Sequence, residues 1–138
     1  MRIETRGRAR ALQALYAWDV RGAQNGTLLP VAERAWDDLA VSSEERVFAS
    51  QLIRTISRQQ KEIDESLAEV TTNWRLERIG AIERCVLRLA AAEFRQGSAP
   101  TRVVLREAVR LAERYGTTAS AKFVNGVLDA VARRSGLL

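Results

Sequence analysis

Apolar side chains recur at helical spacing in six segments of the chain. A repeat of three or four residues places such side chains along one face of an α-helix. The pattern predicts helices at about residues 8–21, after Pro30, and at about residues 42–70, 82–94, 104–115 and 117–131. We therefore expect an all-α protein, with residues 1–138 forming one compact domain of about six to seven helices.

Polar residues predict where the long helix in the middle of the chain begins, bends and ends. Ser42 and Glu45 form a Ser-x-x-Glu capping box, which is typical of a helix start. Glutamines at positions 59–60 interrupt the apolar face, so we expect a bend there. The polar residues 71–73 should end the helix, and a short turn over residues 74–79 should follow.

Glycine, threonine and serine mark the boundaries of the last two helices. Gly116 lies where a left-handed C-terminal cap is expected. Thr117, Thr118 and Ser120 all offer N-cap side chains to the helix that follows. Gly126 lies inside that helix, where glycine costs about 1 kcal/mol relative to alanine. We expect either a helix crossing or the close approach of a ligand at that position.

The charge of the chain is consistent with nucleic-acid binding but does not establish it. The net charge is +5, and only Lys61 and Lys122 among the 22 basic residues are lysine; the others are arginine. Arginine binds phosphate with two parallel hydrogen bonds and stacks on bases. A GC-rich genome would produce the same bias, so only the positions of the arginines count as evidence.

The residue patterns that catalysis requires are missing from the sequence. One cysteine and no histidine exclude an internal disulfide, the usual zinc ligand sets and histidine-dependent catalysis. The sequence also lacks a glycine-rich phosphate loop and an aspartate cluster suited to magnesium. Cys85 lies one position off an apolar face, and we expect it to be inert and partly buried. We predict no enzymatic activity, no catalytic residue, no metal and no cofactor.

The N-terminus carries charge where a secretory signal would be apolar, and no apolar run approaches 18 residues. We therefore expect a cytoplasmic protein without membrane contact.

The basic N-terminal arm, residues 1–10, is the strongest candidate for nucleic-acid binding. Arg6, Arg10 and Gln13 fall on one side of the first helix at about 100° per residue. Tyr16 lies at the border with the apolar side, where its ring could stack on an unpaired base. Basic arms of this kind either bind nucleic acid or are simply solvated, and spacing alone leaves both readings open.

Arg8 does not fit this arrangement, because a helix extended towards the N-terminus would place it on the apolar side. Either the helix starts after Arg8, or the side chain reaches around the helix end.

Four segments of the chain resemble the NusB family, and they occur in the family's order over nearly the whole length. They are RALQALY at 10–16, RIGAIER at 78–84 running on to Glu93, EAVRLA at 107–112 and, most specifically, KFVNGVLD at 122–129. The resemblance implies a bacterial, RNA-binding transcription antitermination factor whose helices form two packed bundles.

The same resemblance implies partners and the residues that bind them. The expected RNA is the single-stranded boxA element of ribosomal RNA leader transcripts, bound together with NusE, which is also a small-subunit ribosomal protein. NusA, NusG and RNA polymerase are expected as indirect partners. With Gln13 added from helix geometry, the residues expected at the RNA are Arg6, Arg8, Arg10, Gln13, Tyr16, Ala119, Ser120, Lys122 and Phe123. Glu77 and Glu83 match acidic positions expected to face NusE.

Two alternatives from other classes remain. A NusB-like domain also forms the N-terminus of a ribosomal RNA cytosine methyltransferase, but that enzyme needs a further domain with a cofactor-binding sheet. We expect this chain, which runs from Met1 to Leu138, to be the separate protein. The second alternative is a protein-interaction module that has lost its RNA affinity. It is suggested by Gly7, which interrupts the basic run where relatives often have continuous arginine or lysine.

Overall fold

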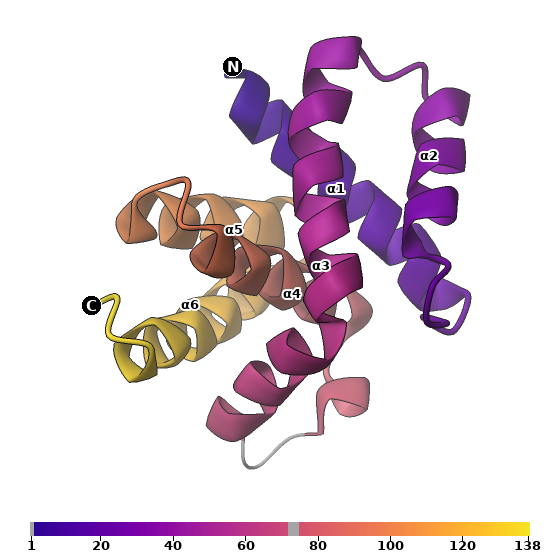
Figure 1. Cartoon of the computed structure of the whole chain (residues 1–138). Helices are drawn as coiled ribbons and strands as arrows, with labels where there is room; N and C mark the ends of the chain where they lie inside the picture. The colour runs from indigo at the N-terminus through magenta and orange to yellow at the C-terminus, as the bar shows by residue number, and fades with distance from the viewer. Residues whose placement is uncertain (1, 72–74) are drawn as a thin grey trace. The chain divides into compact units, whose positions relative to one another are not determined.

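The computed structural model describes residues 2–71 and 75–138. In these residues the chain forms six α-helices, one short 3₁₀ helix and no strand (Figure 1). The elements are α1 (Ile3–Val20), α2 (Leu28–Asp38), α3 (Ser43–Val70), η1 (Leu76–Arg78), α4 (Ala81–Gln96), α5 (Thr101–Tyr115) and α6 (Thr118–Arg134). The predicted all-α class is confirmed. The chain divides into two compact units, Met1–Arg58 and Gln59–Leu138, with the boundary inside α3, and this agrees with the expected two bundles.

The start and the bend of α3 agree with the sequence prediction. The Ser42 hydroxyl accepts the backbone N–H of Glu45 at 3.3 Å and donates to the Glu45 carboxylate at 2.8 Å. Gln59 has non-helical dihedrals, φ −118° and ψ 24°, inside the helix. Of the predicted helix stop and turn, residues 72–74 lie outside the described residues, and the rest of the turn contains η1.

The first helix begins at Ile3, five residues before the predicted start at residue 8. The cause is tertiary packing, which commonly stabilises a helix that is marginal by itself. Gly7 and Arg8 are both buried in the first unit, and a Cβ added at Gly7 would lie 2.6 Å from Phe48 Cδ1. The Arg8 guanidinium lies 5.3 Å from the centroid of the Phe48 ring. Neither explanation offered for Arg8 is therefore correct, because the helix extends and Arg8 lies on its packed side.

Two tryptophans form the centre of the core of the first unit. Trp18 and Trp36 are fully buried, and each indole N–H has an acceptor. Trp18 Nε1 donates to the Gln24 carbonyl at 3.1 Å, and Trp36 Nε1 donates to the Arg10 carbonyl at 3.0 Å. A buried indole N–H without an acceptor would be costly, so these bonds fix the connection around Gln24 and tie α2 to α1.

The helical spacing of apolar residues places Val20, Leu39 and Val47 on core-facing positions, but all three are at least half exposed. Val20 is the last residue of α1, and Leu39 is the C-cap of α2. On α3, the inward position near the start is taken by Glu45 instead of Val47. α2 also begins at Leu28, so it includes Pro30 instead of following it. Proline is tolerated there because the first N–H groups of a helix have no intrahelical partner.

In the second unit, α4, α5 and α6 contact one another. Cys85 is fully buried in this unit rather than partly buried. Gly97 ends α4 in the left-handed conformation at φ 66°. Gly116, predicted to do the same for α5, has φ −119° and ψ −123° instead. It is needed for space, because a Cβ there would lie 2.7 Å from both the Ala112 carbonyl oxygen and Ser120 Oγ.

Gly126 has open space around it. A Cβ added at this position would meet no atom within 4 Å, so the predicted helix crossing is wrong, and the approach of a ligand stays a prediction. Within the described ranges, no helix is both long enough and apolar enough to cross a membrane.

Candidate nucleic-acid interface

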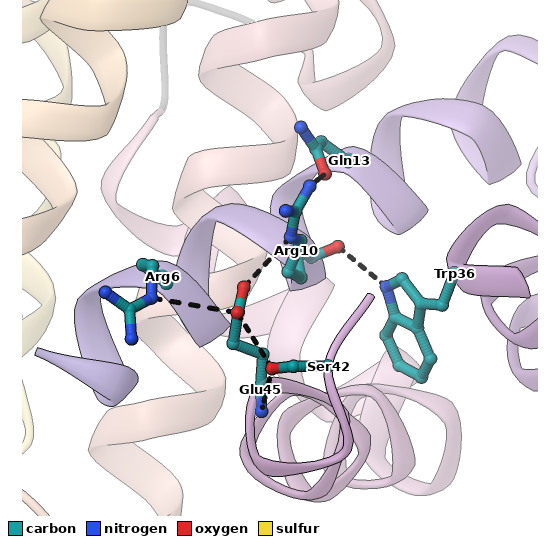
Figure 2. Close-up of polar contacts among 6 residues, drawn as sticks. All are labelled: Arg6, Arg10, Gln13, Trp36, Ser42 and Glu45. Atoms are coloured by element: carbon teal, nitrogen blue, oxygen red, sulfur yellow. Dashed lines mark hydrogen bonds and ion pairs between the residues drawn. The ribbon is translucent and has the colours of Figure 1, made fainter. Parts of the chain in front are cut away.

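Two arginines on one face of α1, Arg6 and Arg10, contact the carboxylate of Glu45 on α3. Arg10 donates from Nε to Glu45 Oε1 at 3.1 Å and from Nη1 to Gln13 Oε1 at 3.2 Å (Figure 2). Arg6 Nε lies 3.7 Å from Glu45 Oε2. The predicted alignment of Arg6, Arg10 and Gln13 on one side of the helix is therefore confirmed. Their common partner was missed, because the sequence indicated only a capping role for Glu45.

Glu45 is a buried anion in a basic surface. Only 8% of the residue is exposed. The hydrogen bond from Ser42, followed by the one from Arg10, lowers the pKa of Glu45 below its ordinary value of 4.5. The charges of Arg10 and Arg6 act in the same direction and burial acts against them. Near neutral pH the cluster therefore holds two guanidinium groups and one carboxylate.

Tyr16 offers an exposed aromatic ring on the same helix. It is 42% exposed, whereas Leu12 and Leu15 are fully buried on the packed side. It follows Gln13 by three residues, so the two side chains lie one turn apart on neighbouring parts of the helix surface. An exposed tyrosine on the helix that carries Arg6 and Arg10 is a suitable surface for stacking an unpaired base.

Arg8 and Gly7 lie on the opposite, packed side of α1. Arg8 is 5% exposed and packs on the Phe48 ring. Its predicted RNA contact stays a prediction, and its burial argues against that contact. Gly7 is buried against the same ring, so the glycine that interrupts the basic run in the sequence does not interrupt the basic face of the helix.

The second group of predicted RNA residues lies at the start of α6, in the other unit. Ala119 and Lys122 are exposed there, and Phe123 is half-buried. Ser120 is buried, and it caps the helix together with Thr117. The Ser120 N–H donates to Thr117 Oγ1 at 3.0 Å, and the Thr117 N–H donates to Ser120 Oγ at 3.1 Å.

The two acidic residues expected at a partner surface have different environments. The Glu77 side chain is exposed on η1, 4.0 Å from Arg75 Nη1. Glu83 is half-buried at the start of α4, where its Oε2 accepts the Ser120 hydroxyl at 2.8 Å. A Cβ at Gly80 would overlap Glu83 Oε1, so that glycine leaves space for the carboxylate. No sequence spacing indicated this link between Glu83 and Ser120.

Together these features define a class of protein: a small all-helical protein with an arginine-bearing helix face and a neighbouring exposed aromatic ring. In the described part of the chain, no group of three or more Cys, Asp or Glu residues could hold a metal ion. The NusB family model matches residues 5–133. The chain belongs to the NusB family.

Individual relatives cover nearly the whole chain. The transcription antitermination protein NusB of Anaeromyxobacter dehalogenans (strain 2CP-1) is 42% identical over 134 residues, covering 96% of this chain and 91% of that protein. The structure of T. maritima NusB has a TM-score of 0.84 and 32% identity, covering 94% and 90% of the two chains. A chain in the crystal structure of the antitermination factors NusB and NusE in complex with dsRNA has a TM-score of 0.86 and 29% identity, covering 97% and 98%.

Proposed function

We propose that this protein is a transcription antitermination factor that binds RNA through the exposed face of α1. The observation that carries the proposal is the grouping of Arg6, Arg10 and Gln13 next to the exposed ring of Tyr16, in a member of the NusB family. Guanidinium groups bind phosphates, and an aromatic ring stacks on a base. Residues 1–138 would then act as one NusB-like RNA-binding domain.

The RNA that we propose is the single-stranded boxA element of ribosomal RNA leader transcripts. The similar NusB–NusE structure holds double-stranded RNA. The exposed ring of Tyr16 supports a single strand for this chain, because only unpaired bases can leave their stack to lie on an aromatic side chain. In the second unit, Ala119, Lys122 and Phe123 at the start of α6 are proposed as further RNA contacts, with Ser120 holding that helix end in place.

NusE is the proposed protein partner, and through it the complex would join NusA, NusG and RNA polymerase. This partner is supported by the crystal structure of a complex of NusB and NusE, in which one chain is similar to this protein. Glu77, which is exposed, is the better placed of the two acidic candidates for a basic partner. The alternative of an interaction module without RNA affinity loses its basis, since Gly7 lies on the packed side of α1.

A titration with labelled RNA tests this proposal. The probes are a boxA-type single strand, the same sequence as a duplex and a scrambled single strand, each measured with and without NusE. We expect the boxA single strand to bind most tightly and NusE to increase its affinity. If the protein binds none of the RNAs, with or without NusE, the proposed function is wrong. Equal binding of the single strand and the duplex would refute the stacking role of Tyr16.

A further inference from the structure

Glu45 is bound from three sides by residues of the first unit. Its Oε1 accepts Arg10 Nε at 3.1 Å, and its Oε2 accepts the Ser42 hydroxyl at 2.8 Å and lies 3.7 Å from Arg6 Nε (Figure 2). The Glu45 side chain is only 10% exposed, whereas those of Arg6 and Arg10 are 41% and 30% exposed. The carboxylate thus lies beneath the two guanidinium groups on the protein side.

Both arginine side chains are partly exposed to solvent, 41% for Arg6 and 30% for Arg10, so an anion can reach them from outside. A guanidinium group has one N–H on Nε and four on its two terminal nitrogens. Glu45 contacts both arginines through Nε. Arg10 Nη1 donates a hydrogen bond to Gln13 Oε1 at 3.2 Å, which fixes the orientation of the guanidinium group. Because Glu45 lies beneath the two guanidinium groups and both arginines are partly exposed, a phosphate can approach each of them from the solvent side.

We propose that Glu45 is a positioning residue of the RNA site, which holds Arg6 and Arg10 side by side so that each can bind a phosphate of the same RNA strand. The inference rests on the proposed RNA-binding function. Arginine side chains have many rotamers, and ordering them costs free energy when a ligand binds. Glu45 reduces this cost by ordering both side chains before the RNA arrives.

A competing account gives Glu45 the opposite effect. A carboxylate close to the phosphates repels them, and it also competes with them for the arginines. In that case, removing its charge strengthens RNA binding. The two accounts therefore predict opposite signs for the same substitution.

Glu44 provides a matched control for the general effect of charge. It neighbours Glu45 in the first turn of α3, and it is exposed. Glu44→Gln and Glu45→Gln change the net charge equally, and both remove a carboxylate from the first turn of the same helix. A difference between the variants therefore reports what Glu45 does to Arg6 and Arg10.

The experiment measures the affinity of the full chain for a boxA-type single-stranded RNA by fluorescence anisotropy, for the parent and both variants. We expect Glu44→Gln to bind as tightly as the parent or somewhat more tightly. Glu45→Gln should bind about 3- to 10-fold more weakly in spite of its added positive charge, as expected from the freed rotamers of two arginines. Equal or tighter binding by Glu45→Gln, relative to Glu44→Gln, overturns the positioning role.

Two further measurements separate this role from a general loss of structure. Glu45→Asp keeps the charge but withdraws the carboxylate by one methylene, so it should also weaken binding; parent-like affinity in this variant contradicts the proposal. NMR of the arginine side chains should show the Arg10 Nε–H protected from solvent exchange in the free parent and unprotected in Glu45→Gln. Protection that is the same in both proteins overturns the proposal even if Glu45→Gln binds weakly. A parent that binds no RNA refutes the proposed function itself, and this inference with it.

Discussion

Ser120 and Glu83 are 37 residues apart in the sequence and are joined by a hydrogen bond of 2.8 Å from the Ser120 hydroxyl to Glu83 Oε2. Ser120 also forms the capping box of α6 with Thr117. A residue expected at the RNA and a residue expected at NusE are thus parts of one polar cluster. Substitutions at either one act on the start of α6 as well as on any ligand.

Charge reversal at Glu77 and Glu83 should therefore have different effects on stability. Glu83→Lys removes the carboxylate that accepts the buried Ser120 hydroxyl and should lower the free energy of unfolding by about 1–3 kcal/mol. Glu77→Lys changes an exposed side chain and should stay within about 0.5 kcal/mol of the parent. Urea unfolding of the two variants measures both values. Equal stability would show that the Glu83–Ser120 bond contributes little to the fold.

NusE binding by the same two variants then tests the partner surface. Glu77→Lys should weaken NusE binding, mainly through a slower association rate, because exposed charges at an interface act mostly on encounter. RNA binding by the free protein should persist. Unchanged NusE affinity would place the interface elsewhere.

The stability of the first unit should depend on pH through Glu45. Its pKa is lowered in the folded protein, so the unfolded chain takes up a proton at higher pH than the folded one. The stabilisation is therefore present at neutral pH and is lost as the pH falls from about 4.5 through the folded pKa. The difference in free energy of unfolding between the parent and Glu45→Gln should shrink over that range. A difference that is constant from pH 7 to pH 3 would contradict this role of the ion pairs.

Gly126→Ala should stabilise the protein by about 0.5–1 kcal/mol. The added methyl group meets no atom within 4 Å, and alanine is the better helix former. Thermal unfolding measures the effect, and a destabilised variant would contradict it. If the variant is more stable but binds RNA or NusE more weakly, the ligand that loses affinity is the one that approaches the backbone at this glycine.

Much of the fold could be predicted from the sequence because local rules determine it. The periodicity of apolar residues, the capping residues Ser42 and Thr117 and the bend at Gln59 all act over a few neighbouring residues. The same helical periodicity placed Arg6, Arg10 and Gln13 together correctly. Where residues within one turn of helix determine the local structure, the spacing of residue types is sufficient to predict it.

The remaining features depend on contacts between distant parts of the chain. The early start of α1 and the burial of Arg8 both require Phe48, about 40 residues further on. Burial of Glu45 in place of Val47 reverses the hydrophobic pattern, and it is possible only because Arg6 and Arg10 partner the carboxylate. A hydrophobic pattern assigns each position from the polarity of its own residue. It therefore does not predict that a charged residue is buried where an apolar one is exposed.

Tyr16 should matter to RNA far more than to the fold. Its ring is 42% exposed, so Tyr16→Ala should remain folded and cost less than the 3–5 kcal/mol typical of a fully buried aromatic residue. If a base stacks on the ring, Tyr16→Ala should lose about 1–3 kcal/mol of binding free energy, and Tyr16→Phe should keep most of it. Thermal unfolding and RNA titration of both variants are needed. Parent-like RNA affinity in Tyr16→Ala would assign the ring to packing.

The salt dependence of RNA binding tests the central claim most directly, namely that Arg6 and Arg10 bind phosphates. The affinity for a boxA-type single strand is measured at several salt concentrations for the parent and for the double variant Arg6→Ala/Arg10→Ala. If each arginine binds one phosphate, the log–log slope should become shallower by about 1.4. Arg102→Ala/Arg106→Ala is the matched control, since it removes two exposed arginines four residues apart on α5, and it should leave the slope close to that of the parent. A slope that is unchanged in the Arg6/Arg10 variant, or reduced equally in the control, would contradict an RNA site on α1.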